Sequence, residues 1–141
     1  MTPSHATGFT GTGQGMTALQ AAQAEILLST RVILHHGECV GADYEAGVIA
    51  RRLGLHIVGH PPVKQHDRAD CDVDERREQF PYLVRNTHIV DETAELIAAP
   101  LQAYEEVRSG VWHTVRYARN LGRPILIISP DGSVTEENPG R

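Results

Sequence analysis

Short apolar runs alternate with amphipathic stretches along this chain, a pattern typical of strands that alternate with helices. The apolar runs predict strands at residues 7–10, 32–35, 56–59, 96–99 and 125–128. Between them, a periodicity of about 3.6 residues predicts helices that begin at Thr17, Asp43, Pro81 and Val111. Because the strands are nearly continuous apolar runs, we expect a three-layer α/β/α fold with a mainly parallel sheet of about five strands.

The periodicity also predicts how the remaining segments behave. In the first helix, the face turned to the core is expected to comprise Leu19, Ala22, Ile26 and Leu27. Residues 63–80 are charged and irregular, which fits either a solvated excursion or a lid over a binding site. Residues 1–6 and 131–141 show no pattern, so we expect flexible tails on a single domain that spans residues 1–141.

Composition and charge narrow the range of functions. The chain of 141 residues is 40% hydrophobic and 22% charged, as in ordinary globular domains, with a formal net charge of -5. That charge disfavours a protein that coats nucleic acid. No apolar run approaches the ~20 residues of a membrane span, and the N-terminus has no signal-peptide pattern. We therefore expect a cytoplasmic protein with no membrane partner.

The cysteines and histidines give little sign of a metal. Cys39 and Cys71 are expected to be reduced thiols, because two cysteines cannot build a disulfide framework. The only residues that could gather around an ion are His35, His36, Cys39 and His60. Their spacing matches no zinc pattern, so the sequence predicts neither a metal site nor a cofactor.

The turn after the first strand is rich in glycine and precedes a helix directly. It contains Thr10, Gly11, Thr12, Gly13, Gln14 and Gly15. Glycines let the main chain approach a ligand closely, and the N-terminus of the following helix favours a phosphate. The spacing is neither that of a Walker A loop nor that of a dinucleotide-binding turn. A tight turn that binds nothing is the alternative.

Further candidate residues follow the other strands and should lie at the same edge of the sheet. The turn after the second strand contains Gly37, Glu38, Gly41 and Asp43. Its acids suit a ribose hydroxyl or a base amine, although Asp43 could serve only as a helix cap. On the third helix, Arg85 and Asn86 either point over the strand ends or lie on the surface.

A second candidate phosphate cradle precedes the last helix. It consists of Arg108, Ser109, Gly110, Val111 and Trp112. Main-chain N–H groups at a helix start and a nearby arginine both bind anions. Trp112 offers either a stacking surface for a base or a large packing residue between helix and sheet.

These motifs, together with His60-Pro61-Pro62, occur in the order seen in the SLOG superfamily, which the chain resembles over residues 7–130. The superfamily embraces LOG/lysine-decarboxylase-like proteins, the DNA-processing protein DprA and small YspA-like domains, and the resemblance is closest to the small stand-alone members. It implies a Rossmann-like fold with a nucleotide site at the strand ends, where His60 joins the binding residues. It also implies a homodimer or higher homo-oligomer.

LOG enzymes cleave the N-glycosidic bond of a nucleoside monophosphate, and the resemblance to their catalytic pattern is incomplete. Arg85 matches the arginine of their Arg-Lys pair, whereas Asn86 replaces the lysine. His113 and Thr114 stand where their turn carries two glutamates. Glycosidic cleavage places positive charge on the ribose and needs an acid/base group or a stabilising anion. The missing carboxylates therefore leave catalysis open.

Three functions remain. The first is a binding module that captures a nucleotide or a nucleotide-derived phosphorylated molecule, as a sensor or a sequestering protein in prokaryotic or phage signalling. The second is a phosphoribohydrolase or N-glycosidase, with Glu38, Asp43 and Arg85 as catalytic candidates. The third and weakest is single-stranded DNA binding as in DprA, which the aromatic content of 5% and the negative charge disfavour.

Overall fold

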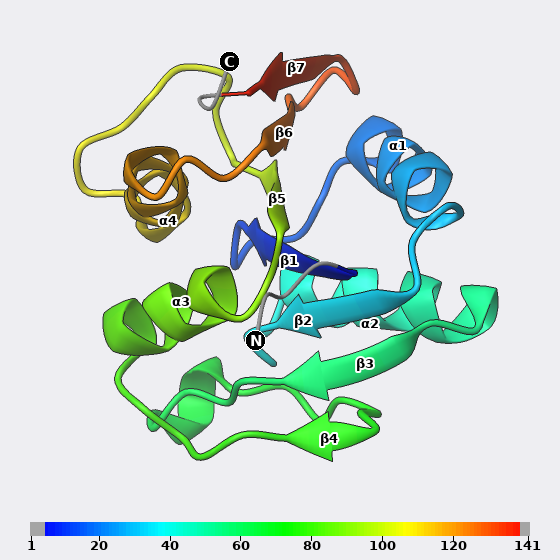
Figure 1. Cartoon of the computed structure of the whole chain (residues 1–141), viewed down its shortest axis with the longest axis vertical. Coiled ribbons are helices and arrows are strands. Elements are labelled where there is room, and N and C mark those ends of the chain that lie inside the picture. The colour runs from blue at the N-terminus through cyan, green and yellow to red at the C-terminus, as the bar shows by residue number, and fades with distance from the viewer. Residues whose placement is uncertain (1–4, 139–141) are drawn as a thin grey trace.

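A computed structural model describes residues 5–138 of the chain. Its sheet contains β1 Ala6–Gly11, β2 Ile33–His36, β3 His56–Gly59, β4 Glu75–Arg76, β5 Glu95–Ala99, β6 Ile125–Ile128 and β7 Val134–Glu137 (Figure 1). The helices are α1 Ala18–Leu28, α2 Ala42–Leu53, α3 Tyr82–Asp91 and α4 Gly110–Asn120, with a short 3-10 turn at Gln65–Asp67. None of the helices within the described range is long and apolar enough to cross a membrane.

The sheet has the order β4-β3-β2-β1-β5-β6-β7, and every neighbouring pair except β6 and β7 is parallel. The prediction of a mainly parallel α/β fold is confirmed, although the sheet has 7 strands. The two unexpected strands, β4 and β7, lie at its edges and lack the apolar character of buried strands. The prediction of flexible tails at residues 1–6 and 131–141 is wrong in two places. Ala6 is the first residue of β1, and Val134–Glu137 forms β7. Residues 1–4 and 139–141 lie outside the described range.

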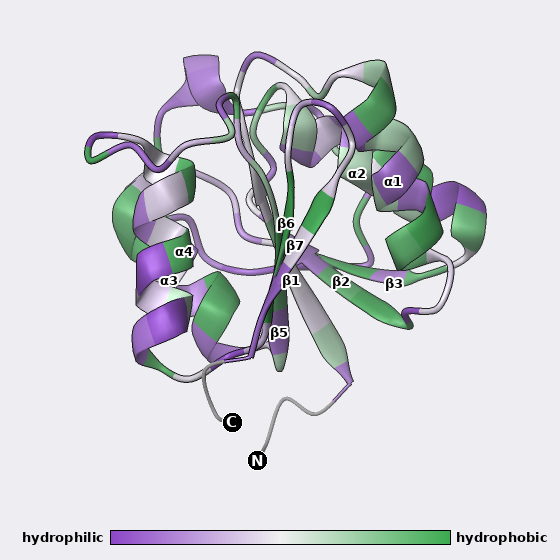
Figure 2. Cartoon of the chain, turned by 90° about the horizontal axis from the view of Figure 1, so that it is seen from above, coloured by the Kyte–Doolittle hydropathy of each residue, from purple (hydrophilic) through white to green (hydrophobic). Residues whose placement is uncertain are grey.

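Helices cover both faces of the sheet (Figure 1, Figure 2). The pair α1 and α2 packs on one face, and α3 and α4 pack together on the other. Under α1 and α2, the core includes Phe9, Leu34 and Ile57. Under α3 and α4, it includes Leu96 and Val115. Removal of these apolar side chains from water is the main favourable contribution to folding.

The helix starts and stops agree in part with the sequence signals. Thr17 is the N-cap of α1, as predicted, and forms a capping box with Gln20. Gly54 ends α2 in the left-handed conformation with φ 82°. The N-cap of α2, however, is Gly41, so that Asp43 lies inside the first turn and is free for another role.

The prediction for the inner face of α1 is wrong, since Leu19 and Ile26 are 59% and 61% exposed. The buried residues of this helix are Gln20, Ala24 and Leu28. The side-chain amide of Gln20 donates to two main-chain carbonyl oxygens at 2.9 and 3.0 Å, which allows a polar side chain to occupy a core position. Because glutamine is hydrophilic, the sequence pattern assigned Gln20 to the solvent side of α1. The predicted inner face was therefore rotated away from the one that is buried.

The strand order determines where a ligand can bind. β1 lies between β2 and β5, so the chain builds β2 to β4 on one side of β1 and β5 to β7 on the other. In open parallel sheets, ligands bind outside the carboxyl ends of the strands at the point where the order reverses. The turn after β1 and the segment that joins β5 to α4 both lie at this point (Figure 1).

Candidate functional site

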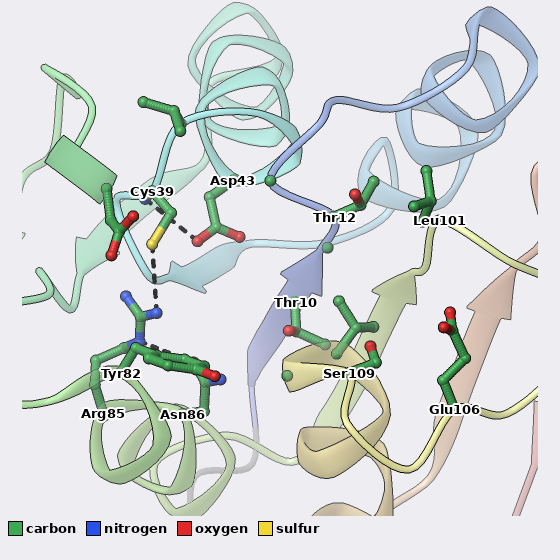
Figure 3. Close-up of a pocket in the computed structure, with 16 residues that line it drawn as sticks. Thr10, Thr12, Cys39, Asp43, Tyr82, Arg85, Asn86, Leu101, Glu106 and Ser109 are labelled. Atoms are coloured by element: carbon green, nitrogen blue, oxygen red, sulfur yellow. Dashed lines mark hydrogen bonds between the residues drawn. The ribbon is translucent and has the colours of Figure 1, made fainter.

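A pocket of about 440 Å³ lies at the carboxyl ends of β1 and β5 (Figure 3). The predicted site residues that line it are Thr10, Gly11, Thr12, Gly13, Asp43, Arg85, Asn86, Ser109, Gly110 and Val111. They come from the turn after β1, the first turn of α2, the helix α3 and the start of α4. The segments after β1 and before α4, which are about 100 residues apart in the chain, therefore lie against the same cavity.

The glycine-rich turn is held by its own main chain. The N–H of Thr12 donates to the carbonyl oxygen of Ala99 at 3.0 Å, and the carbonyl of Thr12 accepts from Ala42 at 3.0 Å and from Gly15 at 3.2 Å. The Thr12 hydroxyl accepts from the N–H of Gln14 at 3.2 Å. Within residues 5–138, the N–H of Gly13 has no hydrogen-bond partner. The turn is thus fixed in shape and retains a free donor at the pocket.

The start of α4 provides further donors. Ser109 is the N-cap, and its hydroxyl accepts from the N–H of Trp112 at 3.3 Å. The N–H groups of Gly110 and Val111 belong to the first turn and have no acceptor within the helix. Both residues line the pocket. A helix N-terminus with free N–H groups favours a negative charge.

Arg85 supplies a positive charge from α3. Its side chain is 4% exposed, and the guanidinium donates to the carbonyl oxygens of Gly37 and His60, the latter at 3.0 Å, and to the side-chain oxygen of Asn86 at 2.8 Å. A weaker contact of 3.4 Å joins Nη2 to the Cys39 sulfur (Figure 3). No carboxylate of the described part of the chain lies within ion-pairing distance of it. The buried cation is positioned by neutral groups and is not neutralised by a direct ion pair.

Asp43 faces the same pocket and carries a perturbed carboxyl group. Burial raises its pKa to about 6, and the positive charge of Arg85 opposes this rise. The carboxylate accepts from the N–H of Cys39 at 3.4 Å and from the N–H of Gly37. At neutral pH the pocket therefore contains a carboxyl group that can take up a proton at a small cost.

Stability should depend on pH through Asp43. The folded-state pKa of about 6 exceeds the 3.8 of an unperturbed aspartate. The stabilisation from the protonated carboxyl group is therefore fully present only below pH 3.8, and it is lost as the pH rises from there through 6. We expect the unfolding free energy of the wild type, relative to Asp43→Asn, to fall by roughly 2.4 kcal/mol between pH 4 and pH 7. Urea unfolding at both pH values measures this. The same difference at both values would contradict it.

Glu38, a catalytic candidate from the sequence, does not line the pocket. Its side chain is fully buried and forms a bidentate ion pair with Arg76 of β4. The Arg76 nitrogens Nη2 and Nε donate to the carboxylate oxygens of Glu38 at 2.7 and 3.0 Å. Its main chain has a positive φ of 52° and accepts from the N–H of Ala69 at 2.8 Å. The buried carboxylate thus attaches residues 63–80 to the turn after β2 and has no access to a substrate in the pocket.

The excursion at residues 63–80 is consequently held against the sheet edge. The N–H of Val40 donates to the carbonyl of Asp67 at 2.9 Å, and β4 extends the sheet from it. Asp67 contributes to the pocket wall. The segment is therefore an ordered strap along one side of the site. It is neither a freely solvated excursion nor a lid that covers the pocket, the two alternatives that its sequence allowed.

Other predicted site residues are also absent from the pocket wall. These are Gln14, Gly15, Gly37, Gly41, His60, Arg108 and Trp112. Gly37 and His60 act behind it, by accepting from Arg85. Trp112 is 4% exposed and packs with Leu96 and Val115, so it serves as a packing residue and not as an open stacking surface.

The pocket wall includes residues that the sequence did not indicate. These are Cys39, Val40, Asp67, Tyr82, Leu101 and Glu106. Tyr82 precedes Arg85 and Asn86 by one helical turn, so helical spacing could have identified it. Leu101, Glu106 and Asp67 come from irregular segments that carry no pattern. The carboxylates of Asp67, Glu106 and Asp43 give the pocket acceptors beside its cationic and N–H groups.

No protein-family model matches the chain, and neither does any curated protein sequence. Among solved structures, it is similar to the molybdenum cofactor binding protein of Rippkaea orientalis, with a TM-score of 0.70 and 21% identity over 89% of this chain and 77% of that one. The Moco carrier protein of Chlamydomonas reinhardtii gives a TM-score of 0.58 and 19% identity over 88% and 75%.

The third comparison is with DprA of Streptococcus pneumoniae, which gives a TM-score of 0.63 and 17% identity. It covers 86% of this chain but only 49% of DprA, so the chain spans about half the length of that protein. At these identities the likeness concerns the fold. Taken with the strand order and the pocket at its reversal point, it shows that the chain has a Rossmann-like fold.

Proposed function

We propose that the protein binds a nucleotide or another phosphorylated small molecule in this pocket and does not alter it, as a sensor or a sequestering protein. The observation that carries the proposal is the Arg85 guanidinium, which is buried at the pocket without a carboxylate partner among residues 5–138. A buried charge without a direct ion pair is costly, and the nearby Asp43, whose pKa is raised to about 6, offsets this charge only in part. A phosphate would supply the missing negative charge and accept from the free N–H groups at Gly13 and Val111.

The rest of the pocket suits the remainder of such a ligand. Its volume of about 440 Å³ lies within the range of small-molecule sites. Asp67 and Glu106 offer acceptors for sugar hydroxyls or a base amino group, and Tyr82 offers an aromatic ring. The likeness to proteins named for binding or carrying the molybdenum cofactor supports a small-molecule ligand and makes that cofactor one compound to test.

Binding without turnover is favoured by what the site lacks. His113 and Thr114 stand at the positions of the two glutamates of LOG enzymes. Glu38 is paired with Arg76 and lies outside the pocket wall. Recovery of an intact phosphorylated compound from denatured, freshly purified protein, identified by mass spectrometry, is the expected result. Release of free base from AMP, CMP, NAD or ADP-ribose would contradict it.

A second candidate function, hydrolysis of an N-glycosidic bond, is favoured by one observation. Asp43 lines the pocket, and its pKa of about 6 is suited to a general acid at neutral pH. Under this alternative, incubation with AMP yields adenine, and Asp43→Asn abolishes the yield while the variant still binds AMP. Under the binding proposal, neither protein yields adenine.

Blocking the pocket should remove binding without loss of stability. A Cβ at Gly13 would meet only the carbonyl oxygen of Val40, at 3.9 Å, so a side chain there has room that the ligand would otherwise occupy. We expect Gly13→Leu to weaken binding of AMP at least tenfold and to change the unfolding free energy by less than about 1 kcal/mol. Calorimetric titration and urea unfolding measure the two effects. Wild-type affinity in this variant would place the ligand elsewhere.

Self-association stays a prediction. The resemblance implies it, and the exposed apolar side chains of Leu19 and Ile26 on α1 are consistent with a further contact surface. Nucleic acid is a less suitable partner, because the formal net charge is -5 and the pocket wall includes Asp43, Asp67 and Glu106.

A further inference from the structure

Two buried histidines and a glutamate meet behind the pocket, on the face of the sheet that α3 covers. They are His35 of β2, His60 directly after β3, and Glu92, the C-cap of α3. One ligand atom of each lies within 4.8 Å of the other two. The residues His35 and His60 are 4% and 1% exposed, and His35 Nδ1 lies 2.8 Å from His60 Nε2.

We propose that His35, His60 and Glu92 bind a divalent transition-metal ion of the Zn²⁺ type. Two imidazole nitrogens and one carboxylate oxygen are a frequent set of three protein ligands for this ion, with solvent in the fourth position. A Zn–N distance of ~2.0 Å in a tetrahedron separates two ligand nitrogens by about 3.3 Å. To admit the ion, the two nitrogens need to separate by about half an ångström, and the rings, whose centroids are 5.1 Å apart with the nitrogens facing each other, need to turn so that both point at the ion.

The surroundings of the cluster also fit a metal ion. The three ligands come from β2, from the residue after β3 and from the C-cap of α3, so the fold itself brings them together before any ion binds. His35 and His60 are both buried among protein atoms, where their ring nitrogens can be offered to an ion as neutral imidazole, the form that coordinates metals. The Glu92 side chain is 36% exposed and provides a path from solvent.

Several charged side chains lie around the cluster, and Arg77 competes with a metal ion for the carboxylate of Glu92. Arg77 donates from Nε to one oxygen of Glu92 at 2.9 Å and leaves the second oxygen available. Glu75 and His56 lie farther out on the same side and pair with each other at 2.5 Å. Arg85 approaches from the pocket side, but it contacts only the main-chain carbonyl of His60.

The cluster differs from the histidine and cysteine group that the sequence made conceivable. His36 lies on the opposite face of the sheet, where Gly47 leaves room for its ring, and Cys39 lines the pocket. Glu92 takes their place, 32 positions after His60. No spacing rule includes such a distance, which explains why the sequence predicted no metal site.

The test is metal binding by the whole chain after removal of metals with a chelator. We expect one Zn²⁺ per chain in calorimetric titration with micromolar or tighter affinity, and visible absorption of bound Co²⁺ of the kind given by four-coordinate sites. Glu92→Gln and His35→Gln should each weaken binding at least tenfold. His56→Gln, which alters only the exposed histidine–acid pair nearby, should bind within twofold of the wild type.

Circular dichroism of each metal-free variant shows whether it is folded, and Glu92→Gln remains informative if a buried histidine variant is not, because Glu92 is partly exposed. The proposal is overturned if the wild type binds no stoichiometric Zn²⁺, since the two histidines then form only a hydrogen-bonded pair. It is also overturned if Glu92→Gln binds as tightly as the wild type, or if His56→Gln is the variant that loses the ion.

Discussion

Replacement of Arg85 by methionine is expected to weaken binding of AMP about a hundredfold. Truncation of one partner of a buried charge pair costs about 2–5 kcal/mol, and about 1.4 kcal/mol corresponds to a factor of ten in affinity. Methionine fills a similar volume but carries no charge and donates no hydrogen bond. Calorimetric titration of AMP into the variant and the wild type measures the loss.

Arg85 also has a structural role, and a control must separate the two effects. The substitution leaves the carbonyls of Gly37 and His60 and the Asn86 side chain without their donor, which should destabilise the fold by a few kcal/mol, or about 1–3 per group before relaxation. Arg123→Met is the matched control, because Arg123 donates to the Thr93 carbonyl at 2.9 Å and does not line the pocket. Wild-type affinity in the folded Arg85→Met variant would refute the assignment of Arg85 as the anion ligand.

Substitution of Gly41 by alanine is expected to have the largest effect on stability. Gly41 is the N-cap of α2 with φ 92° and ψ -131°, a conformation that is nearly confined to glycine and costs other residues about 1–3 kcal/mol. An added Cβ would also collide with the carbonyl oxygen of Gly13 and lie 2.7 Å from that of Thr12. The turn after β1 would have to move, so we expect a loss of at least about 3 kcal/mol.

Gly13→Ala is the matched control for Gly41→Ala, because the two glycines face each other across the same contact. A Cβ at Gly13 has open space, so this variant should unfold within about 0.5 kcal/mol of the wild type. Urea unfolding of both variants and of the wild type compares them directly. A Gly41→Ala protein as stable as Gly13→Ala would show that the two turns do not pack as described.

The parts of the fold that follow from local chemistry were predictable. Continuous apolar runs identified β6 and the central strands, and Thr17 and Gly54 marked helix ends through capping preferences. The parallel sheet then placed the glycine-rich turn and the start of α4 at one edge, because parallel strands end there. The SLOG resemblance agreed with this arrangement and added the expected order of the motifs.

The remaining features depend on tertiary contacts that no local pattern encodes. The burial of Gln20 depends on two carbonyl acceptors from distant parts of the chain, and β4 is attached to the turn after β2 by the Glu38–Arg76 ion pair across 38 positions. The same pair removes Glu38 from the candidate catalytic groups. In contrast, the sequence predicted Asp43 as a site residue and the structure places it in the pocket wall, but its raised pKa could only be seen once its burial was known.

The central claim is that Arg85, the turn after β1 and the start of α4 bind one anionic group together. Titration of AMP, ADP-ribose and inorganic phosphate into isotope-labelled protein, followed by amide chemical shifts in NMR spectra, tests it most directly. We expect the amide signals of Gly13, Gly110 and Val111 to shift together with one dissociation constant, and we expect Arg85→Met to remove all three responses. Shifts confined to one of the two segments, or no saturable shift with any of the three compounds, would contradict it.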